Sequence, residues 1–216
     1  MKNIREYLQN EILIADGAAG TYISSLTGRI SGPCEMLNIT SADTVLRMHK
    51  QYVKAGAKLI LTNTFSASVA GNSIGGDFDT TSAIIKEGVK IASMAAQDNA
   101  YVAADIGPLP ETMFDSAVIS EEYRRIVDTF LASDVNIFVF ETFSYSVYPI
   151  KFSRYIKNKN PEAFIIISFA VMPDGYSREN ISGQRLIDEV AEAQCADAVG
   201  FNCCCGPSHL LNYAQT

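Results

Sequence analysis

Residues 137–142 read Ile-Phe-Val-Phe-Glu-Thr, a short apolar run that ends in a carboxylate and a hydroxyl. Residues 146–157 follow with the pattern of an amphipathic helix. The apolar run itself, residues 137–140, is apolar on both faces, which is typical of a strand in a parallel sheet that helices cover, and Glu141 and Thr142 directly follow this expected strand. The segment therefore predicts one strand, a polar loop and one helix.

The same strand–loop–helix unit repeats along the chain. Strict alternation of strands and helices indicates parallel strands, either in an open doubly wound sheet or in a closed barrel. The other expected strands are residues 12–15, 58–62, 101–105, 164–169 and 197–201. The expected helices are residues 44–55 after a cap at Ser41, 82–97, 121–132 after a cap at Ser120, 146–157, 183–193 and a sixth from Pro207.

The composition is that of an ordinary globular protein, with 48% hydrophobic and 19% charged residues among 216. No linker or low-complexity tract divides the chain, so we expect residues 1–216 to form a single domain. A net charge of −7 argues against a nucleic-acid partner. No signal peptide or membrane-spanning stretch is recognisable, and a cytoplasmic location is the default expectation. Five cysteines in that compartment are expected to be thiols or metal ligands, and three of them are consecutive at residues 203–205.

Polar residues gather at the end of each expected strand. In a parallel barrel these ends emerge on one face, where such barrels carry their active sites. Each residue also has a structural interpretation as a turn, a helix cap, a loop anchor or a small buried filler. Convergence on one face favours a site over these separate interpretations. The residues concerned are Asp16, Gly17, Ala18, Asn63, Asp105, Glu141, Ser168, Asn202 and Cys203.

An ordered series of motifs resembles the homocysteine S-methyltransferase family, from about residue 12 to residue 207. The resemblance implies an α/β fold of the (β/α)8 TIM-barrel type, with about six of the eight units in this chain and the barrel incomplete at the C-terminus. Either another polypeptide or segment completes the barrel, or the chain is a fragment, or it has rearranged. The motifs are Ile14-Ala-Asp-Gly-Ala-Ala-Gly-Thr21, Cys34-Glu-Met-Leu-Asn-Ile-Thr40, His49-Lys-Gln-Tyr-Val-Lys-Ala-Gly-Ala57, Leu61-Thr-Asn-Thr-Phe65, Asp105-Ile-Gly-Pro108, Phe140-Glu-Thr142, Ile167-Ser-Phe169 and Gly200-Phe-Asn-Cys203.

The resemblance also implies the roles of individual residues. Asp16 and Glu141 match the acids that bind the amino group of homocysteine, as suits an ammonium ion. The backbone N–H groups of Gly17 and Ala18 would hold the substrate carboxylate, because small residues let a backbone approach closely. Asn63 and Asn202 are further expected substrate-binding residues. No catalytic side chain is expected beyond the metal that activates the substrate thiol.

Cys203 matches a zinc ligand of the family. Zinc favours the thiolate form of a bound thiol, and the thiolate is the nucleophile that attacks a methyl group. The family supplies two further thiolates from an adjacent Cys-Cys pair near the end of the barrel, and that pair is absent from these 216 residues. The zinc site is therefore expected to be incomplete in this chain, since three consecutive cysteines are poorly arranged to share one metal.

Other interpretations remain open at this point. The chain is either a homocysteine S-methyltransferase that makes methionine or a non-catalytic amino-acid-binding or partner module without the cysteine pair. A redox or metal-storage role for residues 203–205 is a third interpretation. Members of the family take the methyl group from a methylated corrinoid, S-methylmethionine or betaine. The expected partners are homocysteine, a segment or chain that completes the barrel, and a corrinoid protein, with methylcobalamin carried on another domain or protein.

Overall fold

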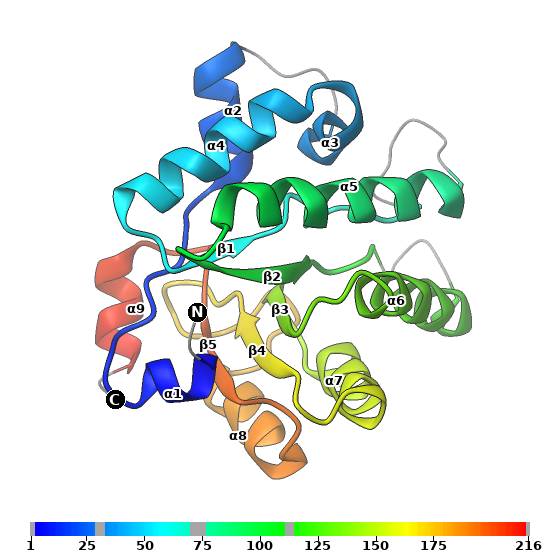
Figure 1. Cartoon of the computed structure of the whole chain (residues 1–216). Coiled ribbons are helices and arrows are strands. Elements are labelled where there is room, and N and C mark those ends of the chain that lie inside the picture. Colours follow the sequence, from blue (N-terminus) through cyan, green and yellow to red (C-terminus); the bar gives the residue numbers. More distant parts are fainter. Residues whose placement is uncertain (1–2, 29–32, 70–76, 111–114, 215–216) are drawn as a thin grey trace. The chain divides into compact units, whose positions relative to one another are not determined.

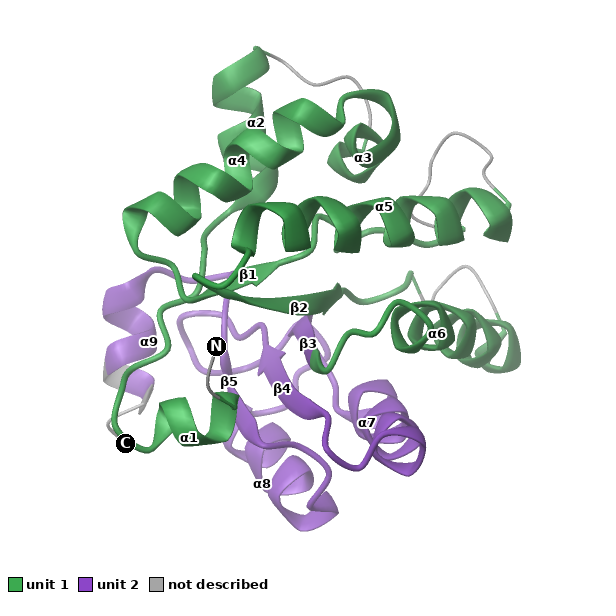
Figure 2. Cartoon of the chain, viewed as in Figure 1, with its two compact units in different colours: residues 1–137 green, residues 138–216 purple. Residues whose placement is uncertain are grey.

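The computed structural model describes residues 3–28, 33–69, 77–110 and 115–214. The chain divides into two compact units, Met1–Ile137 and Phe138–Thr216 (Figure 2). Each unit repeats a strand followed by a helix (Figure 1). The units are described separately below.

Unit 1 contains a parallel strand pair covered by long helices. Strand β1 pairs with β2 in a register that opposes Leu59 to Tyr101. Helix α5 packs against these strands through alanines, whose small side chains allow a close approach. The elements are α1 (Ile4–Leu8), α2 (Ala19–Thr27), η1 (Cys34–Met36), α3 (Leu37–Thr40), α4 (Ala42–Ala55), β1 (Leu59–Leu61), α5 (Phe78–Ala96), β2 (Tyr101–Ile106) and α6 (Ser116–Leu131).

Unit 2 contains three adjacent strands with an aromatic core. The strands follow one another in chain order, and β4 pairs with β5 in parallel. Phe138, Phe140, Phe143 and Phe169 are fully buried, so β3 and β4 carry the largest side chains of this core. The elements are β3 (Ile137–Phe143), α7 (Val147–Lys159), β4 (Phe164–Phe169), α8 (Gly183–Ala193), β5 (Ala198–Phe201) and α9 (Pro207–Ala214).

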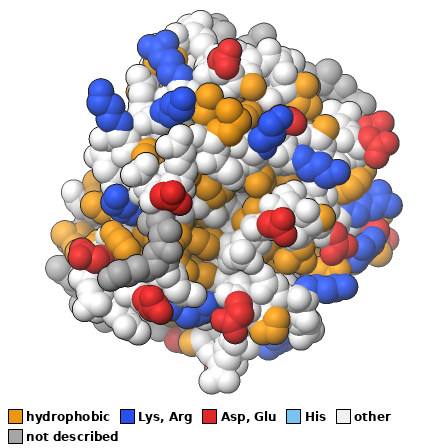
Figure 3. Space-filling model, viewed as in Figure 1, with side chains coloured by type: hydrophobic (Ala, Val, Ile, Leu, Met, Phe, Trp, Pro, Cys, Tyr) orange, Lys and Arg blue, Asp and Glu red, His pale blue; other side chains and the backbone are white. Residues whose placement is uncertain are grey.

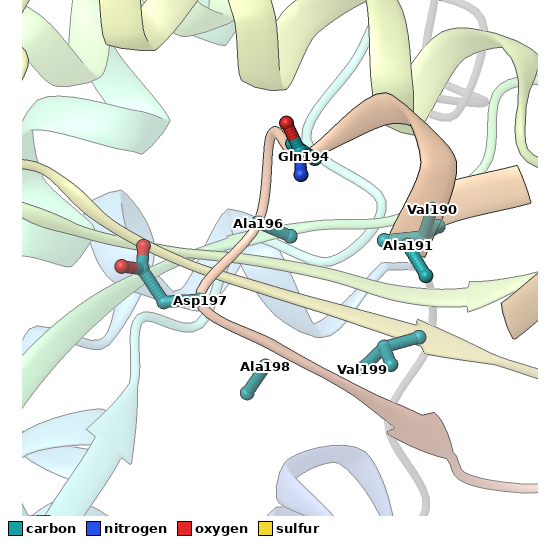
Figure 4. Close-up of a pocket in the computed structure, with 7 residues that line it drawn as sticks. All are labelled: Val190, Ala191, Gln194, Ala196, Asp197, Ala198 and Val199. Atoms are coloured by element: carbon teal, nitrogen blue, oxygen red, sulfur yellow. The ribbon is translucent and has the colours of Figure 1, made fainter. Parts of the chain in front are cut away.

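The two ends of strand β5 have different surroundings. A hollow of about 350 Å³ lies at its beginning and is lined by residues 190–191, 194 and 196–199 (Figure 4). The strand's other end leads into Asn202 and Cys203. The hollow is therefore at the opposite end of β5 from the predicted site residues.

On the face drawn in Figure 3, Lys and Arg side chains lie among Asp and Glu side chains. In the described part of the chain, no helix has both the length and the apolar character needed to cross a bilayer.

Several predicted elements are confirmed and others need correction. Residues 164–169 and 183–193 form the predicted strand and helix with the same bounds. The expected strand at residues 12–15 is reduced to one parallel bridge between Ala15 and Leu59. Helix α6 begins at Ser116, where the Asp115 carboxylate accepts from the N–H of Ala117, so the predicted cap at Ser120 is wrong. Asp115 is the N-cap instead, and the helix continues through Ser120 because a serine inside a helix costs little.

Candidate active site

Asn202 is the centre of a hydrogen-bond network in unit 2. Its Oδ1 accepts from the backbone N–H of Thr142 at 3.0 Å and from the Ser168 hydroxyl at 2.9 Å. Its Nδ2 donates to Glu141 Oε2 at 3.1 Å and to Thr142 Oγ1 at 2.9 Å. A backbone N–H can only donate, so this contact fixes which end of the amide is the oxygen. One side chain thus joins β3, β4 and the turn after β5.

Glu141 lies within β3 rather than after it, because the strand extends to Phe143. The carboxylate is half-buried, and burial raises the pKa of Glu141 above its ordinary value. The N–H donated by Asn202 holds one carboxylate oxygen in place. An incoming ammonium group would compensate for the desolvation of this carboxylate. Glu141 therefore has the chemistry required for binding an amino group.

Cys203 presents an exposed thiol beside this network. Its Sγ lies 3.6 Å from Thr142 Oγ1 and 3.5 Å from Asn202 Nδ2. The backbone here is unusual, with φ of 66° at Thr142, 59° at Cys203 and 55° at Cys204. Such values are uncommon for residues other than glycine and are most unfavourable for a β-branched residue. Strained residues of this kind cluster at functional sites.

In unit 1, Asp16 and its loop are held against β1 and α4. Asp16 Oδ2 accepts from the N–H of Leu61 at 3.0 Å. The Tyr52 hydroxyl donates to the Ala18 carbonyl at 3.3 Å, and a Cβ added to Gly17 would lie 3.1 Å from that hydroxyl. Burial, and then the nearby Asp16 charge, raise the pKa of Tyr52. A larger residue at position 17 would therefore require the Tyr52 side chain to shift by a few tenths of an ångström.

Helix α2 begins directly after this loop. Its N-cap residue is Ala18, which makes no side-chain cap, and no acid lies in the first turn. The first N–H groups of a helix have no partner within the helix and attract anions. The N–H groups at the start of α2, directly after Gly17 and Ala18, are therefore suited to bind a carboxylate.

Asn63 has a different environment from Asn202. Its side chain donates to the Cys34 carbonyl at 2.8 Å and to Asn38 Oδ1 at 3.0 Å, and its Oδ1 accepts from the Cys34 thiol at 3.3 Å. Only 3% of Asn63 is exposed. Burial, and then the adjacent Glu35 carboxylate, raise the pKa of Cys34 to about 12, so this thiol is protonated at neutral pH. Asn63 and Cys34 thus belong to a closed cluster of polar groups.

A zinc site needs several thiolate, imidazole or carboxylate ligands around one position. Cys203 could supply one thiolate, because its thiol is exposed and lies next to Thr142 and Asn202. Over residues 3–28, 33–69, 77–110 and 115–214, no three His, Cys, Asp or Glu side chains come together closely enough to hold a metal ion. Cys204 and Cys205 therefore do not complete a site with Cys203 in this structure.

Sequence reasoning predicted Glu141, Asn202 and Cys203, and the structure brings these three together in unit 2. The prediction that Asp16, Glu141 and Cys203 converge on one face stays a prediction, because Asp16 belongs to the other unit. Sequence reasoning gave no role to the side chains of Thr142 and Tyr52. The signal for Thr142 was its position directly after Glu141 at the predicted strand end. Nothing in the sequence marked Tyr52, which carries the pattern of an ordinary helix face.

Comparisons with known proteins place the chain among methyltransferases. The sequence profile of the family described as homocysteine S-methyltransferase matches residues 13–216. The chain is 31% identical to methionine synthase of Mycobacterium leprae (strain TN) over 149 residues, which are 61% of this chain and 12% of that protein. It is 20% identical to homocysteine S-methyltransferase 1 of Brassica oleracea var. italica, covering 88% of this chain and 68% of that one. It thus spans only a small part of the methionine synthase.

A solved structure has the same fold. The metallated form of the homocysteine methyltransferase MmuM from Escherichia coli superposes with a TM-score of 0.79 at 18% identity, covering 94% of this chain and 78% of that chain. The predicted fold class, α/β of the (β/α)8 barrel type, is confirmed by this likeness. The prediction that residues 1–216 form a single domain stays a prediction.

Proposed function

The chain belongs to the homocysteine S-methyltransferase family, and we propose that it binds homocysteine and takes part in the transfer of a methyl group to the homocysteine sulfur, which makes methionine. The observation that carries this proposal is that Glu141 and Cys203 both lie beside Asn202, whose Nδ2 is 3.1 Å from Glu141 Oε2 and 3.5 Å from Cys203 Sγ. A carboxylate suited to an ammonium group and a thiol suited to a metal lie next to the same amide. An amino acid with a thiol side chain needs both a partner for its ammonium group and a metal for its sulfur.

Recognition of the amino acid is assigned to charged and backbone groups. Glu141 binds the substrate ammonium, and because the carboxylate is half-buried the ion pair is screened less than one at the surface. In unit 1, Asp16 is the second proposed partner of the amino group. The N–H groups of Gly17 and Ala18, followed by the uncapped start of α2, bind the substrate carboxylate.

Cys203 is the proposed zinc ligand from this chain. Zinc, when bound, favours the thiolate form of homocysteine and so supplies a nucleophile at neutral pH. The family resemblance assigns the two remaining thiolates to a Cys-Cys pair that is not among these 216 residues. The described residues hold the Cys203 sulfur in place through Thr142 and Asn202.

The methyl donor is proposed from the methionine synthase relatives. Methylcobalamin on another domain or on a separate corrinoid protein is the donor that this similarity favours. A companion segment or chain that completes the barrel is part of the same proposal. The chain spans 12% and 10% of the two mycobacterial methionine synthases that it resembles, so further domains accompany the matching region in those proteins.

A second candidate function is an amino-acid-binding module without catalysis. It is favoured by one observation, the lack of three metal-binding side chains close together in the described ranges. Glu141 and Asp16 would still bind an amino group without a metal. The two functions differ in their need for zinc, and that difference can be measured.

Calorimetry and a methionine assay test both functions. The protein is titrated with homocysteine with and without a chelator, and methionine is measured with methylcobalamin, S-methylmethionine and betaine as donors. Glu141→Gln keeps the shape but removes the charge, and we expect homocysteine binding to weaken about 10- to 100-fold. Glu192→Gln, on the exposed face of α8, is the control and should bind as the unsubstituted protein does.

The outcomes separate the proposals. Methionine formation that the chelator abolishes supports the enzyme. Homocysteine binding that is indifferent to the chelator, without turnover from any donor, supports the binding module. If the protein neither binds homocysteine nor forms methionine, or if Glu141→Gln binds as tightly as the unsubstituted chain, the proposed function is wrong.

A further inference from the structure

We propose that Cys203 is a thiol-exchange site that reacts with the disulfide of homocystine, the oxidised dimer of homocysteine, and then carries a homocysteinyl group as a mixed disulfide. The inference rests on one part of the proposed function, the binding of the substrate ammonium group by Glu141. It requires no metal, because exchange needs only one thiol and an incoming disulfide. It adds a covalent modification to the same site.

Cys203 meets the first requirement of such an exchange, which is access to its sulfur. All five cysteines of the chain are free, and Cys203 is exposed. In residues 3–28, 33–69, 77–110 and 115–214, no three His, Cys, Asp or Glu side chains are grouped so that they could hold a metal ion. The surroundings of the Cys203 sulfur are therefore those of a single accessible thiol.

The neighbours of Cys203 distinguish it from the two cysteines that follow. Asn202 Nδ2 lies 3.5 Å from Cys203 Sγ and 3.1 Å from Glu141 Oε2. The sulfur and the carboxylate are thus close to the same amide nitrogen. In the described part of the chain, Cys203 is the cysteine of residues 203–205 whose sulfur bonds to this network. A disulfide that also carries an ammonium group should therefore react here in preference to Cys204 or Cys205.

Homocystine has the chemistry that this arrangement recognises. Each half carries an ammonium nitrogen and a sulfur at the two ends of a three-carbon chain, so one half can engage Glu141 and Cys203 together. The half-buried Glu141 carboxylate accepts charge-assisted hydrogen bonds from the ammonium group. The disulfide sulfur of the same half is then held beside Cys203, and holding two reactants together accelerates their reaction.

The exchange conserves atoms and electrons. The Cys203 thiolate attacks one sulfur of homocystine, so that a new S–S bond forms and the original one breaks. The other half leaves as homocysteine thiolate and takes up the proton that Cys203 lost. Homocystine is itself the oxidised reactant, so no further oxidant takes part. The attached homocysteinyl group occupies the proposed amino-acid site, and we expect it to block homocysteine binding until a reducing thiol removes it.

Peptide mass spectrometry after timed exposure to homocystine, with a chelator present, measures the modification of each cysteine. We expect Cys203 to be modified at least about 10-fold faster than Cys204 or Cys205. Dithiodibutyrate, which is homocystine without its two ammonium groups, should lack this preference. Calorimetry should show that the modified protein no longer binds homocysteine and regains binding after treatment with dithiothreitol.

Two variants test the part that the Glu141 charge plays. Glu141→Gln should slow the reaction of homocystine with Cys203 about 10-fold, since the ammonium group loses its charged partner. The same variant should react with dithiodibutyrate as the unsubstituted protein does, which shows that the thiol is still accessible. Glu192→Gln removes a charge from the exposed face of α8 and should leave both rates unchanged.

Equal modification of the three consecutive cysteines, or an unchanged homocystine rate in Glu141→Gln, makes the inference wrong. Calorimetry separates this result from failure of the proposed function. If homocysteine binds and Glu141→Gln weakens that binding while the modification is unselective, the inference alone is wrong. If homocysteine does not bind, the proposed function is wrong, and modification that still selects Cys203 through Glu141 would support the exchange site by itself.

Discussion

Two asparagines follow strands of this molecule, and their surroundings differ. Asn63 comes after β1 in unit 1, is 3% exposed and bonds to Cys34 and Asn38. Asn202 comes after β5 in unit 2, is half-buried and bonds to Glu141 and Thr142. In the first cluster Asn38 and Asn63 are buried and Cys34 is half-buried, whereas the second has an exposed thiol at its edge.

The backbone conformations of the two regions also differ. In the Asn202 region, Thr142, Cys203 and Cys204 all have positive φ. In the Asn63 region, the described residues from 33 to 69 include only Gly56 with positive φ, at the end of α4. Buried polar groups with complete hydrogen bonding specify a core, while strain beside an exposed nucleophile is typical of a site. The surroundings of Asn63 favour a stabilising role, whereas those of Asn202 are typical of a site; the substrate-binding role predicted for each asparagine stays a prediction.

The largest predicted effect is on the closed cluster. Asn38 donates to the Asn63 and Ile84 carbonyls and accepts from the Asn63 amide. Asn38→Ala removes these three hydrogen bonds from buried groups, so we expect the free energy of unfolding to fall by about 3 to 5 kcal/mol. Denaturant titration measures it.

The exposed Asn10 provides the control for this change. Asn10→Ala should alter stability by less than about 0.5 kcal/mol. A loss of less than about 1 kcal/mol in Asn38→Ala would contradict a stabilising role for the closed cluster. The comparison would then no longer support a stabilising role for the Asn63 region.

The next effect concerns another buried polar group of unit 1, His49. The side chain is fully buried, neither ring nitrogen has a hydrogen-bond partner in the described structure, and burial lowers the pKa of His49 from 6.5 to about 4. The unfolded chain therefore binds a proton between pH 6.5 and 4 that the folded chain does not. Stability is present above pH 6.5 and is lost as the pH falls through about 4.

His49→Leu isolates this contribution, because all other titrating groups are shared with the unsubstituted protein. The stability difference between the two proteins should change by about 3 kcal/mol from neutral pH to pH 4, with the unsubstituted protein losing more. Urea titrations at several pH values measure it. Parallel pH curves would show that the histidine is not held neutral by burial.

The sequence predicted the elements better than the partners of their polar residues. Periodicity located β4 and α8 with correct bounds, because an apolar run and an amphipathic pattern depend on nearby residues. It ended β3 too early, since Glu141 and Thr142 are polar yet remain in the strand. The hydrogen-bond partners of these residues, Asn202 and Cys203, come from the turn after β5, which is distant in sequence. No local pattern could distinguish Asn63 from Asn202, because burial and strain are tertiary properties.

The smallest predicted effect tests the strain in the Asn202 region. Cys204 is exposed with φ of 55°, a conformation that asparagine tolerates better than cysteine. Cys204→Asn should raise the free energy of unfolding by about 0.5 to 1 kcal/mol without changing zinc affinity. Cys205→Asn is the matched control, because Cys205 lacks a positive φ and offers no strain to relieve. Loss of zinc binding in Cys204→Asn would mean that adjacent cysteines share the metal, and the assignment of Cys203 as the only ligand from this segment would be wrong.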